Sequence, residues 1–399
     1  MKPYVDALVR EALSDAIEAG LLRTSTMPGF RVAAPRYPAF GDLACDVALV
    51  LARELGEPPR AIAALVMGRL RDRHGWLAGV EVGGPGFVNF RFAPPFWRAC
   101  LAEALAAGAA YGRTASAPGR RIRIEVERED PSAAPSVGDG RAGAIAGATA
   151  RLLAAAGCDV EQVGAVPEIE GLAVGVRPRG AGAPAELIAV AGASQAGEVA
   201  RRDRMGSVLR LLSVHPVSLT RDGEPVPGDV PLADVVREIG RDATRFLLLL
   251  ERPDRPVELD LELAKLERTD NPVFYVQYAC ARLGAVLGAA PAVAATPDLS
   301  QLDDLDVEPL RALAAWPDVL NEASRALEPH RVAAHAVELA AAVHRWMNRT
   351  RIGTERATGA SPARLALATC VRQVLHSALL VCGVSVPERI VRPDVEEVA

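Results

Sequence analysis

The chain has 399 residues, half of them hydrophobic, which is enough for two or three domains with large cores. Its formal net charge of −5 excludes a globally basic surface of the kind that marks nucleic-acid binding. Six scattered cysteines without a CxxC pair favour reduced, mostly buried thiols over a disulfide or zinc framework. No apolar run reaches the roughly 18 residues of a membrane span, and the N-terminus has no signal-peptide core. We therefore expect a soluble, cytoplasmic protein without membrane contact.

Residues 1–113 begin with three amphipathic helical stretches, at the N-terminus, at 41–53 and at 60–71. They are followed by a glycine-interrupted stretch, 80–92, whose second half alternates as a strand does. A regular pleat would place Phe87 and Asn89 on the face opposite Phe90 and Phe92. Residues 104–119 are typical of a linker.

A β-loop-α-β unit is predicted next. Residues 121–127 alternate strictly as a strand, 141–156 are helical and 158–163 form a second strand, which predicts a parallel, right-handed crossover. The loop between the first strand and the helix, 128–140, carries three polar residues of interest, namely Asp130, Ser136 and Asp139.

Residues 164–200 are rich in Gly, Ala and Pro, with a strand expected at 185–191. The Gly-rich turn at 191–195 is alone a weak phosphate signal. A strand at 207–213 leads to 217–223, which contains Val217, Arg221 and Asp222. Arg221 could contact phosphate, but a surface turn is the more common role of such a sequence.

From residue 266 onward we expect about five helices, with breaks that include Pro317. Asn271 before Pro272 is a helix start, because the amide can cap free N–H groups and proline tolerates the first helical position. The spacing of Val273, Val276, Cys280, Leu283 and Leu287 predicts one buried face. Tyr275, Tyr278 and Arg282 lie along a different face. They either complete a helix–helix contact or stack on bases and touch phosphates.

The local charge changes sign in this region. Residues 325–372 hold eight arginines and three acids, whereas 298–308 form an acidic run, and the chain ends in an acidic tail with Asp394, Glu396 and Glu397. A charge cluster is usually only a solvated face. Three histidines also fall here, His330, His335 and His344, but their five- and nine-residue spacing does not place all three on one helical face, so we expect no metal site.

The stretch 270–282, Asp-Asn-Pro-Val-Phe-Tyr-Val-Gln-Tyr-Ala-Cys-Ala-Arg, resembles the motif that opens the helical anticodon-binding (DALR) domain of arginyl-tRNA synthetases. The resemblance extends over most of the chain. It implies an α/β plus all-α fold in three parts: an N-terminal α+β tRNA-binding domain at 1–113, a reduced, Rossmann-like class I synthetase core with a parallel sheet at 120–265, and an α-helical anticodon-binding domain at 266–399.

The resemblance also implies surfaces for tRNA. In that family an aromatic and an amide two residues apart hold a base of the tRNA D-loop, and the matching positions are Phe87 and Asn89. The anticodon domain of the family has an aromatic pair followed by asparagine, where this chain keeps Trp346 and Asn348. The expected tRNA contacts of the helical domain are therefore Asn271, Tyr275, Tyr278, Arg282, Arg345, Trp346, Asn348 and Arg349. The acidic tail departs from the family pattern.

The catalytic signature of the family is not kept. The family has an Asn-Pro-Thr, then a two-histidine signature, then a lysine-containing loop. Asp130 stands at the asparagine, Ser136 and Asp139 stand at the two histidines, and Val217 and Asp222 stand at the lysines. Amino-acid activation develops negative charge on the phosphates, and losing one stabilising donor typically costs about 10²–10³ in rate. A carboxylate at Asp139 even has the wrong sign.

The leading interpretation is a non-catalytic paralogue that binds tRNA, with an arginine isoacceptor as one candidate, and serves as an adaptor or regulator without a cofactor. Two alternatives stay open. One is a residual enzyme that acts on aminoacyl-tRNA or activates an acid by different residues. The other is a scaffold that binds a protein partner and no RNA, which the net negative charge favours.

Overall fold

The computed structural model describes residues 1–24, 26–113, 118–128, 130–164, 166–169, 176–177, 186–194, 208–290, 297–350, 352 and 361–386. The acidic tail lies outside these residues. The chain divides into two compact units, Met1–Ala106 and Ala107–Ala399. The further division of the second unit at residue 265 stays a prediction.

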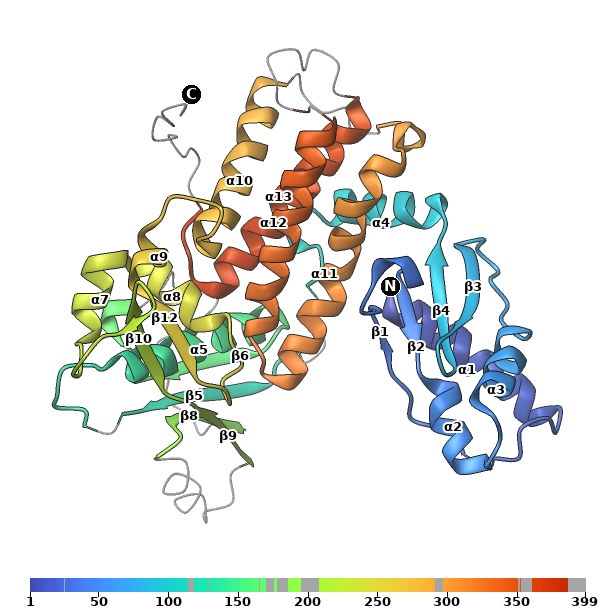
Figure 1. Ribbon diagram of the computed structural model, residues 1–399, viewed down its shortest axis with the longest axis horizontal. Coiled ribbons are helices and arrows are strands. Elements are labelled where there is room, and N and C mark those ends of the chain that lie inside the picture. Colours follow the sequence, from blue (N-terminus) through green and yellow to red (C-terminus); the bar gives the residue numbers. More distant parts are fainter. Residues whose placement is uncertain are drawn as a thin grey trace. The chain divides into compact units, whose positions relative to one another are not determined.

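The first unit combines four helices with a four-stranded antiparallel sheet in the order β1-β2-β4-β3 (Figure 1). The helices are α1 (Lys2–Glu18), α2 (Val47–Leu55), α3 (Pro59–Met67) and α4 (Pro94–Ala107), and the strands are β1 (Val32–Ala33), β2 (Leu43–Cys45), β3 (Leu77–Gly83) and β4 (Phe87–Phe92). Val88, Phe90 and Phe92 of β4 are buried while Phe87 and Arg91 are exposed, as the alternation predicts, but Asn89 departs from it because its side chain is also buried.

The second unit contains a five-stranded, all-parallel sheet in the order β7-β6-β5-β8-β9. The strands are β5 (Arg121–Glu127), β6 (Asp159–Val163), β7 (Val176–Arg177), β8 (Glu186–Gly192) and β9 (Val208–Val214). Helix α5 (Val137–Ala155) connects β5 to β6 and is buried along most of its length, which confirms the β-loop-α-β unit. The helix begins four residues before the expected position, because Ser136 caps it.

A smaller sheet follows, in the order β11-β10-β12, formed by β10 (Val217–Arg221), β11 (Glu224–Pro225) and β12 (Val257–Asp260). Strands β10 and β11 form a hairpin, whereas β10 and β12 are parallel. Helices α7 (Leu232–Ile239), α8 (Arg241–Leu249) and α9 (Leu261–Lys265) complete this region. The surface turn expected within residues 217–223 is therefore shorter than expected. Only Asp222 and Gly223 form it, both with positive φ, and the preceding residues are strand.

The C-terminal part is a helical bundle of α10 (Pro272–Ala289), α11 (Val307–Ala326), α12 (His330–Thr350) and α13 (Pro362–Cys382) (Figure 1). The expected break at Pro317 is wrong, because α11 continues through it. Proline at this position leaves the carbonyl of Leu313 without its helical donor, and the hydroxyl of Tyr111 donates to that carbonyl instead, at 3.4 Å.

Helix α13 corrects the expectation that no segment could span a membrane. By length and composition alone it qualifies, but 67% of its apolar window is buried inside the protein. It packs against α10, α11 and α12 and against α5 of the core. Its apolar character is that of the central helix of a bundle.

His335 of α12 generates a pH prediction. It is 4% exposed and stacks on Trp316 at 5.7 Å between ring centroids, and burial lowers its pKa to about 4. Because the folded pKa lies below the unfolded value, stability is full above pH 6.5 and falls as the pH drops towards 4, by at most about 1.4 kcal/mol per pH unit.

We expect the His335→Phe variant to keep the stacking contact and to lose this part of the pH dependence. Urea unfolding between pH 4 and 7 measures it. An unchanged slope in the variant would show that other groups carry the acid sensitivity.

Candidate functional site

The N-terminus of α5 is closed by its own side chains. The hydroxyl of Ser136 accepts a hydrogen bond from the backbone N–H of Asp139 at 3.1 Å, and the carboxylate of Asp139 accepts from the backbone N–H of Ser136 at 2.9 Å. This is a capping box, in which two otherwise free helix donors are satisfied reciprocally. Arg128 adds a cation, with its Nε 3.8 Å from the carboxylate of Asp139. The two residues at the signature positions thus stabilise the helix.

Asp130 has a similar local role in the loop before α5. Its carboxylate accepts from the backbone N–H of Ser132 at 2.8 Å and from the hydroxyl of the same residue at 2.5 Å. These bonds hold the pKa of Asp130 below its usual range. The arrangement is a turn in which the side chain replaces a backbone acceptor.

Arg141 is fully buried one turn into α5, and its guanidinium is committed to the fold. It donates to the backbone carbonyls of His215, Arg252 and Arg255 at 2.6–2.7 Å. Desolvation lowers its pKa to about 10. Arg141 therefore ties α5 to the two segments that lead into β10 and β12. No local pattern in the sequence predicted this structural role.

Arg221 lies at the end of β10, and an acidic network surrounds it. Its Nη1 donates to Glu238 at 2.7 Å and also to Glu262, while Lys265 pairs with the same two carboxylates at 2.7 and 2.9 Å. Hydrogen bonds to the carboxylates raise the pKa of both cations. Val217 begins β10 and makes the first pair of its parallel pairing with β12, and Asp222 forms the hairpin turn. The cations in this region are thus neutralised by the protein itself.

Helices α10 and α12 meet through an aromatic and polar contact. His344 stacks against Tyr275 and Tyr278 at 4.5 and 5.5 Å between ring centroids. Arg282 donates to Nδ1 of His344 at 3.0 Å and to Asn348 at 3.2 Å. In this structure the half-buried side chains of Tyr275, Tyr278 and Arg282 therefore complete a contact between two helices. From the sequence, His344 was considered only as a metal ligand. In the structure it contacts all three of these side chains.

Three of the residues expected to contact tRNA have buried side chains, namely Asn89, Asn271 and Trp346. Trp346 is 1% exposed and donates its indole N–H to Asp306 at 2.8 Å. Asn271 is 4% exposed. It caps α10 as predicted by accepting from the N–H of Val273 at 3.2 Å, and it donates to the carbonyl of Ala264 at 2.8 Å. Neither Trp346 nor Asn271 can offer a surface to a base.

Two exposed arginines of α12 are paired as well. Arg345 donates to Glu308 of α11 at 2.7 Å, and Arg349 lies 3.4 Å from the same carboxylate. Both arginine side chains remain more than half exposed. Since exposed ion pairs contribute little to stability, these arginines can exchange Glu308 for another anion at small cost.

The first unit holds the more open surface. A pocket of about 610 Å³ is lined by Phe87 and Asn89 together with Arg36, Tyr37 and Phe40. The rings of Tyr37 and Phe40 are 54% and 48% exposed, and Phe87 is 36% exposed. Exposed aromatic rings around a cation are the usual means of holding unpaired bases. The sequence singled out Phe87 and Asn89 but missed the aromatic residues of the 3₁₀ turn at Pro38–Phe40.

Glycines let the walls of this pocket approach each other. A Cβ at Gly83 would lie 2.4 Å from the amide nitrogen of Asn89, so this side chain rests directly on the neighbouring strand. Gly41 has φ +113°, and a Cβ there would lie 2.6 Å from the carbonyl oxygen of Phe90. The backbone N–H of Asp42 donates to that carbonyl at 2.8 Å. The turn that carries Tyr37 and Phe40 is thereby anchored to β4.

The six cysteines carry no disulfide. Cys100 is half-buried and the others are buried, as expected, and burial raises the pKa of Cys45, Cys280, Cys370 and Cys382 to about 12. Within the described part of the chain, no three His, Cys, Asp or Glu side chains gather into a potential metal site.

The capping box gives a stability prediction. Ser136→Ala and Asp139→Ala should each lower the free energy of unfolding by about 1 kcal/mol, because each leaves helix donors without acceptors. Ser136→Thr keeps the hydroxyl and serves as the control. Urea titration followed by circular dichroism measures the effect, and wild-type stability in both alanine variants would show that the cap is unimportant.

The chain is similar to known proteins in both sequence and fold. The family model of the DALR anticodon binding domain matches residues 276–390, and that of the arginyl tRNA synthetase N terminal domain matches residues 5–92. The arginine–tRNA ligase of Anaeromyxobacter dehalogenans is 28% identical over 597 aligned positions, which cover 100% of this chain and 99% of the relative. That of Syntrophotalea carbinolica is 27% identical over 555 positions, covering 98% and 100%.

Because these alignments span many more positions than the 399 residues of this chain, they contain long gaps in it. Among solved structures, Thermus thermophilus arginyl-tRNA synthetase matches with a TM-score of 0.70 and 18% identity, covering 96% of this chain and 100% of the other. The Plasmodium falciparum arginyl-tRNA synthetase matches with a TM-score of 0.68 and 8% identity, covering 96% and 98%. With both domain models and relatives aligned along its whole length, the chain belongs to the arginyl-tRNA synthetase family.

Proposed function

We propose that this protein binds tRNA without charging it, and that it acts in the cytoplasm as an adaptor or regulator. The observation that carries the proposal is the capping box of α5. In the resemblance drawn from the sequence, Ser136 and Asp139 occupy the positions of the two signature histidines. Here they bond to each other and to the helix end.

Electrostatics supports the loss of activation chemistry. A nucleotide phosphate at the start of α5 would meet the carboxylate of Asp139, and the two negative charges repel. Arg141 already donates to three backbone carbonyls. Arg221 and Lys265 are paired with Glu238 and Glu262. Charge developing on a leaving pyrophosphate would therefore have to compete with protein partners for these cations.

Two features support tRNA binding. The DALR model covers most of the helical bundle, and the N-terminal model covers the pocket of Phe87 and Asn89. That pocket offers three exposed aromatic rings for stacking, while Arg345 and Arg349 present exposed guanidinium groups. An arginine isoacceptor is the first candidate, since the relatives are named arginine–tRNA ligases.

A protein-interaction scaffold is the second candidate function. The observation that favours it is the pairing of Arg345 and Arg349 with Glu308, which removes net positive charge from the α12 surface. Failure to bind total tRNA at low salt would favour this function over tRNA binding.

The first prediction of this proposal concerns catalysis. Arginine-dependent ATP–pyrophosphate exchange should stay at background, with and without tRNA, because the groups that stabilise the phosphates are absent or engaged. An active arginine–tRNA ligase assayed alongside is the control. Exchange above background with arginine, or with another amino acid, would establish a residual enzyme and contradict the proposal.

The second prediction concerns RNA. Binding of total tRNA, measured by filter retention, should weaken as salt rises, because arginine–phosphate contacts release counterions. Phe87→Ala should weaken binding about 5- to 100-fold, the value of one stacked base. Leu21→Ala removes an exposed apolar side chain from the same unit and is the control. Equal affinities of the two variants would show that tRNA does not use this pocket.

A further inference from the structure

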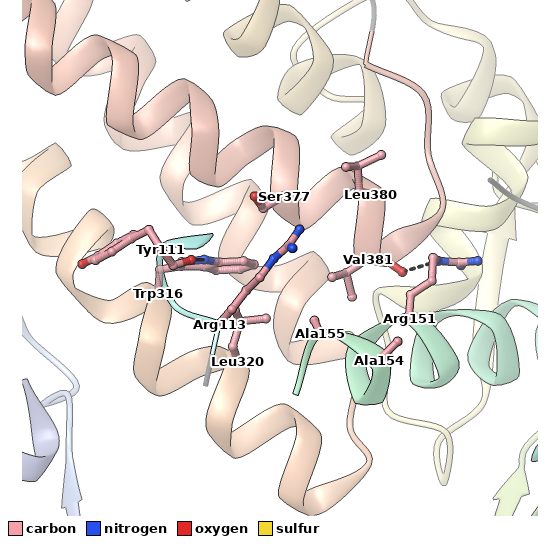
Figure 2. Close-up of a pocket in the computed structure, with 10 residues that line it drawn as sticks. All are labelled: Tyr111, Arg113, Arg151, Ala154, Ala155, Trp316, Leu320, Ser377, Leu380 and Val381. Atoms are coloured by element: carbon pink, nitrogen blue, oxygen red, sulfur yellow. Dashed lines mark hydrogen bonds between the residues drawn. The ribbon is translucent and has the colours of Figure 1, made fainter. Parts of the chain in front are cut away.

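A second, smaller pocket lies wholly within the unit Ala107–Ala399, in the bundle and the core beside it. Its volume is about 150 Å³, and its walls come from α5, α11, α13 and the short segment Tyr111–Arg113 (Figure 2). The body is apolar, with Trp316, Leu320 and Val381 among its lining residues. Cavities of this size hold a benzene-sized ligand.

The segment Tyr111–Arg113 is held firmly against α11. The indole N–H of Trp316 donates to the carbonyl of Tyr111 at 3.2 Å, and the hydroxyl of Tyr111 donates to Leu313. Gly112 has φ +80°, and a Cβ there would lie 2.6 Å from the indole ring. Only glycine allows the chain to pass so close to Trp316. The backbone of Arg113 is therefore fixed beside the pocket.

The polar groups at the pocket are cationic or neutral. Figure 2 shows the side chain of Arg113 running from the Leu320 side towards Ser377. Within the part of the chain that the structure describes, the guanidinium of Arg113 makes no hydrogen bond or ion pair. Among the described residues, the hydroxyl of Ser377 has one hydrogen-bond partner, the side-chain N–H of Gln373, from which it accepts at 3.5 Å. These two side chains leave donor capacity unused at one end of an apolar space.

Buried positive charge lies at the other wall. Arg151 is 8% exposed and donates through Nε to the carbonyl of Val381 at 2.9 Å. Arg245 lies behind Arg151 and does not line the pocket; it is 2% exposed and donates to the backbone carbonyls of Ile169 and Gly383. Burial and the neighbouring Arg245 lower the pKa of Arg151 to about 10. The lining contains two arginines and no acid, so its potential favours an anion.

We propose that this pocket binds a small apolar monocarboxylate of about the size of benzoate. Its carboxylate accepts hydrogen bonds from the guanidinium of Arg113 and the hydroxyl of Ser377. Its apolar body packs against Trp316, Leu320 and Val381. The proposal is independent of tRNA binding and of catalysis, since the pocket shares no residue with the surfaces assigned above.

Benzoate is the probe, and benzamide is its neutral counterpart of the same shape. Titration of the full chain is followed through the four tryptophan indole N–H signals in nitrogen-15 NMR spectra, assigned with Trp→Phe variants. We expect benzoate to shift the Trp316 signal with a Kd of about 1 mM, the affinity typical of so small a ligand, and to bind at least about tenfold better than benzamide.

Variants locate the site and test its charge. Arg113→Gln should abolish the preference for benzoate, whereas Arg325→Gln removes an equal charge from exposed α11 surface and should leave it unchanged. Ala155→Leu should fill the pocket and prevent binding of both probes. No shift of the Trp316 signal up to about 20 mM benzoate, equal binding of benzamide, or wild-type affinity in Arg113→Gln would each overturn the proposal.

Discussion

The free N–H groups at the start of helix α5 attract an anion, and in this protein the anion is the carboxylate of Asp139, a residue of the same helix. A helix start attracts negative charge through its free N–H groups and its dipole. The hydroxyl of Ser136 and the carboxylate of Asp139 satisfy backbone N–H groups at this helix start. The nearby cations also have partners in the protein, because Arg141 donates to backbone carbonyls and Arg221 pairs with Glu238 and Glu262. These side chains therefore contribute to the fold.

The two surfaces expected to contact RNA differ in how many of their side chains are already engaged within the protein. On α10 and α12 the aromatic and basic residues contact each other first, through His344, Arg282 and Glu308. A nucleic acid would have to displace these contacts. The first unit instead keeps an open pocket with exposed rings at Tyr37, Phe40 and Phe87. We therefore expect the first unit to contribute more to tRNA binding than the helical bundle does.

Local patterns in the sequence predicted local structure well. The Asn271–Pro272 helix start, the alternation at 121–127 and the buried face of α10 depend only on neighbours in the chain, and they are present except that Leu287 is only half-buried. The resemblance to a known family predicted the long-range architecture, because a fold of this size cannot be assembled from periodicity alone. The capping box at Ser136–Asp139 is also a local pattern, since Ser-x-x-Asp before a helix is a signal of a helix start.

What the sequence could not show were partners distant in the chain. Trp346 is buried because Asp306, forty residues earlier, accepts its indole N–H. Pro317 is tolerated inside α11 because Tyr111, about two hundred residues earlier, donates to the carbonyl that it leaves free. The most direct test of the account is a crystal of the full chain grown with ATP, magnesium and arginine. The account predicts no nucleotide at the start of α5 and an intact Ser136–Asp139 cap. An arginyl-adenylate with its phosphate on that helix end would contradict it.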